Sequence, residues 1–361
     1  MSVGTNVTRV DAYEKVTGRA KFTDDYILDR CLVAKVCHST IANGRVVHID
    51  TSKAEQVPGV VKVVTFKDVP DVAFPTPGHP WSVEAAHQDV ADRRILTDRV
   101  RDFGDDIAAV IARDEVSAAR AVRLIEIEYE EYPPVVEPEA AMKQNGLPIH
   151  EAHKDNILAS SKYELGDVDA GMAQAEKILH ATYKTPMVSH WHIEAPISYA
   201  YMEKDRIVIV TSTQIPHIVR RVCGQALNIP WGKIRVIKPY IGGGFGNKQD
   251  VLYEPLNAFL TTQVGGRPVK LDISREETFI STRTRHRIDF EISCGVDHEG
   301  RMIAKQMRAV SNQGAYASHG HSIVANAATA FRHLYHVENI RAQAYTVYTN
   351  TPVGGAMRGY G

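Results

Sequence analysis

Residues 233–260 read KIRVIKPYIGGGFGNKQDVLYEPLNAFL, and this stretch decides the local fold of the second half of the chain. The apolar run 233–237 predicts a strand, and the apolar spacing within 252–260 predicts a helix. Between them lie three successive glycines, 242–244. Glycine reaches positive φ without steric cost and has no Cβ. The stretch therefore predicts a loop between a strand and a helix N-terminus, whose backbone N–H groups can meet a ligand such as a phosphate.

Two nucleotide-binding motifs fail at this loop. The phosphate-binding motif requires Ser or Thr after its Gly-Lys pair, but Lys248 is followed by Gln249. The dinucleotide fingerprint requires a third glycine where Asn247 stands. A nucleotide-binding protein is thereby disfavoured. A glycine-rich turn that only reverses the chain stays open as the alternative to a ligand-binding loop.

Composition sets outer bounds on the class of protein. The chain has 361 residues, 44% hydrophobic and 24% charged, which is typical of a globular protein with room for two domains. A formal net charge of -1 argues against nucleic-acid and anionic-membrane partners, because both need clustered basic surface. No stretch approaches the roughly 20 apolar residues of a membrane span. The opening MSVGTNVTRVDAYEK lacks a signal-peptide core, and the four cysteines form no CxxC pair. These features predict a cytoplasmic protein.

The first part of the chain, residues 1–145, reads as a small α/β unit. Residues 107–111 predict a strand, 114–122 a helix with Asp114 as its N-cap, and 125–129 a second strand expected to lie parallel beside the first. Further strands are predicted at 31–38 and 60–66.

The polar, proline-containing stretch 130–160 predicts a linker, and we set the domain boundary within it, at residue 145. His150 and His153 could form a metal pair there. Because no third ligand lies nearby in the sequence, a solvated loop is the favoured interpretation, and no residue is predicted as a metal ligand.

Residues 146–361 mix helical crossovers with antiparallel hairpins. The strand 206–210, a helix opening at Pro216 and the strand 233–238 predict a β-α-β unit. A further strand is predicted at 268–273. The alternation in 288–296, ending at an Asp-His-Glu-Gly turn, predicts a hairpin. The whole chain is therefore predicted to have a mixed α/β (α+β) fold.

Four separated segments agree with one known family. Residues 9–20 read RVDAYEKVTGRA, 212–217 read STQIPH, 242–249 read GGGFGNKQ and 355–361 read GAMRGYG. In order and spacing they resemble the molybdenum-binding subunit of the xanthine dehydrogenase and aldehyde oxidase family, most of all the bacterial three-subunit xanthine dehydrogenases. The resemblance implies an α/β-hammerhead domain (1–145) followed by a first molybdopterin-binding domain (146–361) that is incomplete at its C-terminal end.

The resemblance assigns roles to residues around the predicted loop. Gln214 matches a glutamine whose amide hydrogen-bonds an oxygen on molybdenum; otherwise it would be a turn residue capping the helix at Pro216. The cofactor-binding residues it implies are Gly243, Gly244, Phe245, Gly246 and Arg358. The implied cofactor is molybdenum with molybdopterin or its cytosine dinucleotide, and Phe245 is also a plausible anchor in the core.

Three positions of the sequence match substrate contacts in the family. Tyr360 is expected to provide one face of a sandwich around a flat heterocycle, although a chain end with an arbitrary aromatic residue is the alternative. Gln249 stands where purine-oxidising members usually carry a glutamate, and Asn326 stands where they carry an arginine. Glutamine keeps the hydrogen-bonding reach but offers no charged acceptor. Both departures weaken the case for xanthine itself.

The implied reaction is hydroxylation of a purine or related heterocycle, with electrons leaving through partner subunits that carry 2Fe-2S clusters and FAD. The family's catalytic base is a glutamate in a second molybdopterin-binding half, which residues 1–361 do not contain, so this chain alone is expected to be inactive. Glu194 is a candidate substitute base, but a structural role near the cofactor loops is favoured. A non-catalytic assembly module and an aldehyde oxidoreductase are the alternatives.

Overall fold

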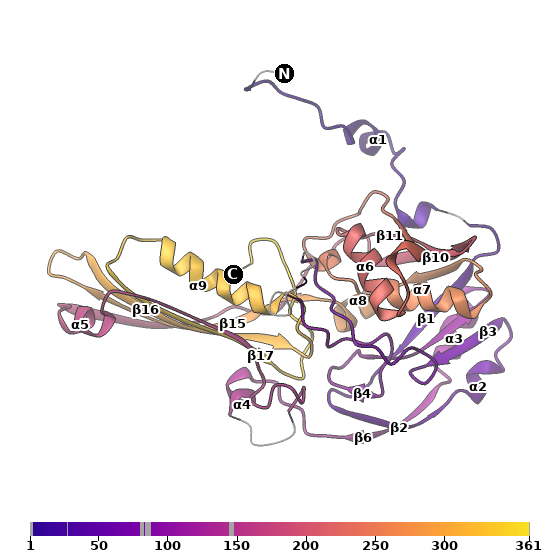
Figure 1. Cartoon of the computed structure of the whole chain (residues 1–361), viewed down its shortest axis with the longest axis horizontal. Helices are drawn as coiled ribbons and strands as arrows, with labels where there is room; N and C mark the ends of the chain where they lie inside the picture. The colour runs from indigo at the N-terminus through magenta and orange to yellow at the C-terminus, as the bar shows by residue number, and fades with distance from the viewer. Residues whose placement is uncertain (1–2, 27, 80–82, 84–87, 144–147, 361) are drawn as a thin grey trace.

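The computed structural model describes residues 3–26, 28–79, 83, 88–143 and 148–360. Two lobes lie side by side, each built on a sheet, and an N-terminal arm with the short helix α1 (Ala12–Val16) reaches away from the larger lobe (Figure 1). Within the described residues, no helix has the length and apolar character needed to cross a membrane.

The larger lobe contains a seven-stranded sheet of order β12-β11-β10-β13-β1-β5-β3. Its strands are β1 (Leu32–His38), β3 (Val60–Thr65), β5 (Asp106–Ala112), β10 (Ile197–Glu203), β11 (Arg206–Thr211), β12 (Ile234–Ile237) and β13 (Val269–Asp272). β1 pairs in parallel with β13, so segments from both sides of the expected boundary share one sheet. The boundary at residue 145 stays a prediction.

Helices cover both faces of this sheet. They are α2 (Ser52–Glu55), α3 (Glu115–Val122), α6 (Pro216–Ala226) and α7 (Glu254–Gln263), while α8 (Arg275–Ser281) follows β13. All of β5 is buried: Ala109 and Ile111 join the largest core with residues of α6 and α7, whereas Val110 packs with α2 and α3. A strand covered on both faces reads as a continuous apolar run, which is why β5 was predictable.

The strand after α3 was predicted wrongly. β6 (Glu126–Glu131) does not lie beside β5 but pairs antiparallel with β2 (Gly44–Asp50), in a small sheet completed by β4 (Arg99–Val100). The sequence of β6, EIEYEE, has only one apolar face and therefore suits a sheet with a solvated side. The cap was predicted correctly, since Asp114 accepts a 2.8 Å hydrogen bond from the N–H of Ser117.

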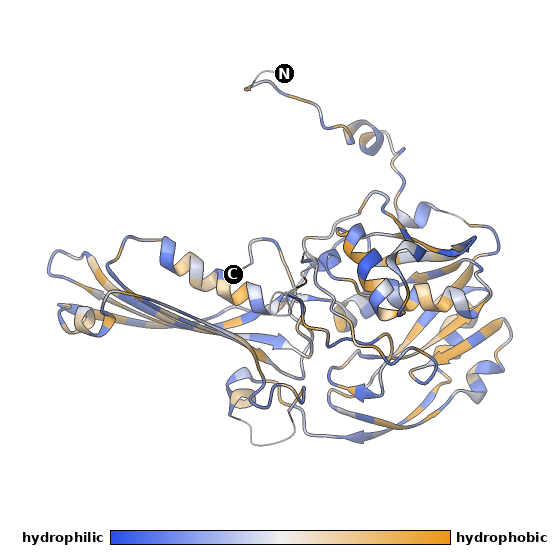
Figure 2. Ribbon diagram, in the orientation of Figure 1, coloured by the Kyte–Doolittle hydropathy of each residue, from blue (hydrophilic) through white to orange (hydrophobic). Residues whose placement is uncertain are grey.

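The smaller lobe is a five-stranded sheet of order β7-β17-β16-β15-β8. Its strands are β7 (Ile157–Leu165), β8 (Lys177–Lys184), β15 (Arg287–Val296), β16 (Met302–Gly314) and β17 (Asn339–Tyr348). The hairpin of β15 and β16 confirms the prediction for 288–300. Helix α9 (Gly320–His333) lies along this sheet, while α5 (Val168–Ala173) lies at its far end (Figure 1). Its strands alternate between polar and apolar residues, whereas those of the larger lobe are more uniformly apolar (Figure 2).

The remaining elements are short. They are the helix α4 (Pro138–Met142), the two-stranded pair β9 (Val188–Ser189) and β14 (Thr284–Arg285), and the 3-10 turns η1 (Thr23–Asp25), η3 (Trp231–Lys233) and η4 (Asn247–Gln249). His150 is not solvated as predicted: its Nε2 lies 2.7 Å from the carbonyl oxygen of Ala315 and its ring packs against Tyr348. Burial lowers the pKa of His150 to about 3. Aromatic neighbours distant in sequence cause this burial.

Candidate functional site

The glycine loop lies between β12 and the turn η4, at the junction of the two lobes. The prediction that it leads directly into a helix N-terminus is wrong, because η4 (Asn247–Gln249) intervenes and α7 begins only at Glu254. Pro255 in the first turn of α7 explains the start of the helix, since proline suits that position and no interior one. The loop therefore presents its own backbone, without the dipole of a following helix.

Two glycines are required by the close packing of this loop. A Cβ added to Gly246 would lie 2.2 Å from the carbonyl oxygen of Ala356, and Gly246 has a φ of 113°. A Cβ added to Gly244 would lie 2.5 Å from Oε1 of Gln214. The loop is thus wedged between two segments distant in sequence. Phe245 adopts a φ of 53°, a backbone strain of about 1–3 kcal/mol for a residue other than glycine, and such strain is common at ligand sites.

The backbone N–H groups in the middle of the loop are open, which here means that they have no hydrogen-bond acceptor among the described residues. Gly246 donates a 3.1 Å hydrogen bond to Oε1 of Gln214, and Gly242 donates to Glu194. Between them, the N–H groups of Gly243, Gly244 and Phe245 have no acceptor within the part of the chain that the structure describes. Three successive unpaired donors can bind an anionic or polar ligand. No such donor set is needed for a turn that only reverses the chain.

Glu194 fastens the other side of the loop. Its Oε2 accepts 2.8 Å hydrogen bonds from the N–H of Gly242 and from Nζ of Lys248. Lys248 is almost fully buried, and burial lowers its pKa although Glu194 opposes that change. A carboxylate so engaged favours the structural interpretation of Glu194 over that of a substitute base.

Gln214 faces this loop from the start of α6. Its backbone N–H donates to the carbonyl oxygen of Lys248 at 2.8 Å, and its side-chain oxygen accepts from Gly246. The alternative role as helix cap is absent, because the N-cap of α6 is Ile215 and no side-chain cap bond is made. With Oε1 occupied, the side-chain NH₂ of Gln214 remains as a donor.

The segment around Arg358 completes this side of the site. The N–H of Arg358 donates a 2.9 Å hydrogen bond to the carbonyl oxygen of Phe245, so the two predicted motifs meet. Tyr360 lies two residues further on and lines a cavity of about 90 Å³ together with Phe290 and Ile323 of the smaller lobe. The described structure thus brings Gln214, the glycine loop and the Arg358 segment together.

The other two predicted substrate residues, Gln249 and Asn326, lie in different places from each other. The N–H of Gln249 bonds the carbonyl oxygen of Gly246 at 2.9 Å, which sets Gln249 at the end of the loop. Asn326 is exposed on α9, and no hydrogen bond or ion pair among the described residues joins it to Gln249 or Tyr360. Asn326 therefore stays a prediction without a described contact.

Sequence reasoning missed a buried pair beneath the loop. Nδ2 of Asn247 lies 2.8 Å from Nε2 of His192, and Oδ1 of Asn247 accepts from the N–H of Arg283 at 3.2 Å. Burial lowers the pKa of His192 to about 4, so its imidazole is neutral and can accept from the amide. Asn247 directly follows the glycine loop, and this adjacency was the only signal for it in the sequence.

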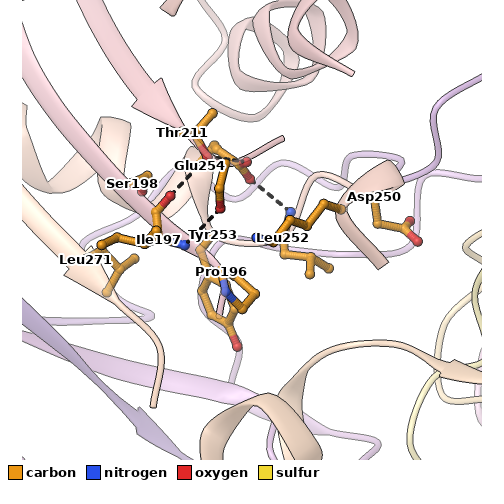
Figure 3. Close-up of a pocket in the computed structure, with 11 residues that line it drawn as sticks. Pro196, Ile197, Ser198, Thr211, Asp250, Leu252, Tyr253, Glu254 and Leu271 are labelled. Atoms are coloured by element: carbon orange, nitrogen blue, oxygen red, sulfur yellow. Dashed lines mark hydrogen bonds between the residues drawn. The ribbon is translucent and has the colours of Figure 1, made fainter. Parts of the chain in front are cut away.

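A cavity behind Lys248 has room for no ligand larger than a water molecule. Its volume is about 20 Å³, close to the space of one water molecule. Figure 3 shows Glu254 on its wall, where Oε1 accepts from the hydroxyl of Thr211 at 2.9 Å and Oε2 from the N–H of Leu252 at 3.1 Å. Burial raises the pKa of Glu254.

Comparisons with known proteins agree with this arrangement. Residues 149–361 match the molybdopterin cofactor-binding domain family, and residues 17–133 match the aldehyde oxidase and xanthine dehydrogenase a/b hammerhead domain family. The putative xanthine dehydrogenase molybdenum-binding subunit XdhA of Escherichia coli is 48% identical over 354 residues, which are 98% of this chain and 47% of that protein. The nicotinate dehydrogenase large molybdopterin subunit of Eubacterium barkeri is 34% identical, covering 99% of this chain and 82% of that protein.

Solved structures show the same fold. The aldehyde oxidoreductase of Desulfovibrio gigas superposes with a TM-score of 0.89 at 26% identity, over 98% of this chain and 39% of that one. Quinoline 2-oxidoreductase of Pseudomonas putida gives 0.88 at 27% identity, over 99% of this chain and 46% of that one. This chain therefore spans less than half the length of the E. coli relative and of these two structures.

The fold and its matched domains define a molybdopterin-binding protein with a hammerhead domain, which confirms the predicted fold class. The chain belongs to the aldehyde oxidase and xanthine dehydrogenase family of molybdenum-dependent oxidoreductases, as a counterpart of their molybdenum-binding subunit. The residues present fit the cofactor of that family: three open N–H groups and one free side-chain amide suit a group rich in acceptors.

Proposed function

We propose that this chain forms the first molybdopterin-binding half of a molybdenum hydroxylase that acts on a purine or related N-heterocycle. The observation that carries the proposal is the row of unpaired N–H groups at Gly243, Gly244 and Phe245, beside the free amide of Gln214. When bound, the molybdenum cofactor, as molybdopterin or its cytosine dinucleotide, supplies the two-electron oxidation chemistry.

The roles of the chain's own residues follow from this geometry. The open N–H groups bind acceptor atoms of the cofactor, and the glycines let the loop pack tightly enough to aim them. The NH₂ of Gln214 donates a neutral hydrogen bond near the metal. Arg358 fixes its segment to Phe245 through its backbone, and Tyr360 offers a flat face to the substrate.

Substrate choice rests on Gln249 and Asn326. Both are neutral amides that donate and accept hydrogen bonds, so they suit a heterocycle with mixed ring nitrogens and carbonyls. An aldehyde oxidoreductase of the same family is the second candidate, favoured by the D. gigas superposition.

We propose that turnover also involves parts outside residues 1–361. We infer that a second molybdopterin-binding half, on the same or another chain, supplies the carboxylate base, and that iron-sulfur and FAD subunits receive the electrons. This chain covers 82% of the E. barkeri relative, whose name describes a large molybdopterin subunit. The isolated residues are therefore expected to be inactive.

The experiment compares Gly246→Ala with Gly232→Ala in protein purified with its natural partners. A Cβ at Gly246 would strike the backbone of Ala356, whereas one at Gly232 meets nothing within 4 Å. We expect molybdenum and pterin content, measured by mass spectrometry and pterin fluorescence, to fall about tenfold in Gly246→Ala only, as strain of about 1.4 kcal/mol would produce.

Molybdenum undetectable in the unmodified complex would overturn the proposal. Gln214→Ala then separates a hydroxylase from a non-catalytic assembly module. The hydroxylase predicts lowered turnover at unchanged molybdenum content, whereas the assembly module predicts a normal complex with no loss of activity.

A further inference from the structure

Three side chains from two distant parts of the sequence converge beside the end of the glycine loop. His79 and Asp89 come from the segment between β3 and β4, and His321 comes from the first turn of α9. One ligand atom from each lies within 4.8 Å of the others. Nδ1 of His79 is 2.6 Å from Oδ1 of Asp89, and the rings of His79 and His321 have centroids 5.2 Å apart. We name these three residues the His79 cluster.

The imidazole of His321 points to a missing ligand. Its Nδ1 is buried and has no hydrogen-bond partner within the described residues. An imidazole nitrogen that carries no proton can offer its lone pair to a metal ion. A simple hydrogen bond between His79 and Asp89 explains their own contact but leaves His321 without a partner.

Neighbouring side chains orient the cluster. Arg221 of α6 donates to the carbonyl oxygen of His79 at 3.1 Å, and its Nη2 lies 3.8 Å from Oδ2 of Asp89. The other carboxylate oxygen, Oδ1, therefore faces the imidazoles. The ring of His319 packs edge-on against His79 with centroids 4.7 Å apart. Groups of this kind fix the rotamers of metal ligands in known sites.

We propose that the His79 cluster binds a divalent transition-metal ion, with Zn²⁺ the first candidate. Two imidazoles and one carboxylate suit zinc and its neighbours, whereas Mg²⁺ and Ca²⁺ prefer sites made of oxygen ligands. Three protein ligands leave a coordination position for water. Its three ligands share no residue with the glycine loop, so the proposal goes beyond the proposed function.

The ion connects His79 in the hammerhead part of the chain to His321 in the smaller lobe. This connection lies next to Gln249, a predicted substrate contact. Pro77 pairs with Asp250 in an isolated bridge, and a Cβ on Gly78 would lie 3.0 Å from the carbonyl oxygen of Gln249. Bridging His79 to His321 on α9 therefore fixes the backbone against which Gln249 packs. The metal therefore stabilises the contact between these two parts of the chain beside Gln249.

The test uses the complete protein purified with its natural partners, depleted with a zinc chelator and then titrated with Zn²⁺ or Co²⁺. We expect one equivalent of Zn²⁺ per chain by mass spectrometry, and visible Co²⁺ absorption bands typical of nitrogen and oxygen ligands in low coordination. His321→Ala and Asp89→Asn should weaken binding by at least the roughly 10- to 100-fold that loss of even an outer partner causes.

His298→Ala is the matched control, because His298 lies in the exposed turn between β15 and β16, with 81% of its side chain accessible. It should bind Zn²⁺ as the unmodified protein does. Molybdenum content measured in parallel reports whether each variant folds and whether the proposed cofactor site survives. The proposal is overturned if the depleted, unmodified protein takes up no Zn²⁺ and shows no Co²⁺ bands on titration, a result that needs no variant to fold.

Discussion

The two sheets of the molecule differ in how they are covered. The seven-stranded sheet has helices on both faces, and every residue of β5 is buried. The five-stranded sheet packs a much smaller core against α9, and its edge strand β8 exposes about half of Ile178, Leu179 and Tyr183. The difference shows that the larger lobe supplies the rigid support. The smaller lobe contributes a surface beside the site.

The glycine loop depends on both lobes. Glu194 and Lys248 fasten it from the larger lobe, while the segment after β17 fastens it through the N–H of Arg358. Its open N–H groups are therefore aimed by contacts from two differently stabilised units. Substitutions that weaken one lobe selectively test whether the two lobes are stabilised differently.

The largest expected effect is in the larger lobe at His38. Its Nδ1 is 3.0 Å from Asp106 and its Nε2 is 3.3 Å from Glu277 of α8, so it ties the hammerhead part to the later chain. His38→Ala leaves Oδ1 of the buried Asp106 without its charged partner, although Oδ2 keeps Arg93, and should lower the free energy of unfolding by about 3–5 kcal/mol. Denaturant unfolding at neutral pH measures the loss, and His298→Ala serves as control.

The stabilisation that His38 provides should depend on pH. Burial alone lowers the pKa of His38, but hydrogen bonds to Asp106 and Glu277 raise it from 6.5 to about 9. The pKa of His38 is higher in the folded chain than in the unfolded chain. His38 therefore contributes fully to the free energy of unfolding below about pH 6.5, and this contribution is lost as pH rises through 9. The stability difference between His38→Ala and the unmodified chain should therefore shrink in this window. A difference that grows there would contradict the ion-pair account.

The next effect compares the two sheets directly. Ile111 is fully buried in β5, and Ile111→Ala should cost about 2–5 kcal/mol. Ile178 is 53% exposed on β8, and Ile178→Ala should change stability by less than about 0.5 kcal/mol. Thermal and denaturant unfolding measure both variants. Equal losses would mean that the five-stranded sheet is covered as fully as the seven-stranded one.

The smallest effect comes from helix caps, one in each lobe. Ser274 caps α8 and Asp167 caps α5, each accepting a backbone N–H at 3.2 Å and 3.0 Å respectively. Ser274→Ala and Asp167→Ala should each lower the free energy of unfolding by about 1 kcal/mol. If the lobes unfold separately, Ser274→Ala shifts only the transition of the larger lobe and Asp167→Ala only the other. If both variants shift one common transition, the lobes form a single cooperative unit.

Local patterns made much of the fold predictable. The strand 206–210, the helix opening at Pro216 and the parallel strand after it all formed as expected, because each depends on its own periodicity. The prediction for β6 failed because the choice of partner strand depends on which sheet needs a one-faced strand. The sequence also could not show that a tyrosine ring covers His150.

The site was predictable only in part. The glycine loop and the Arg358 segment stood out as motifs, and they do meet. The pair Glu194–Lys248 joins positions 54 residues apart, and no local pattern marks that contact. His79 and His321 lie in different parts of the chain, so only the folded structure brings them together.

An experimental structure of the protein with its natural partners and its molybdenum cofactor bound would show directly whether the glycine loop holds the cofactor. We expect acceptor atoms of the cofactor within hydrogen-bonding distance of the N–H groups of Gly243, Gly244 and Phe245, with the amide of Gln214 directed at the metal centre. A cofactor bound elsewhere, with these three N–H groups facing only solvent, would contradict this expectation.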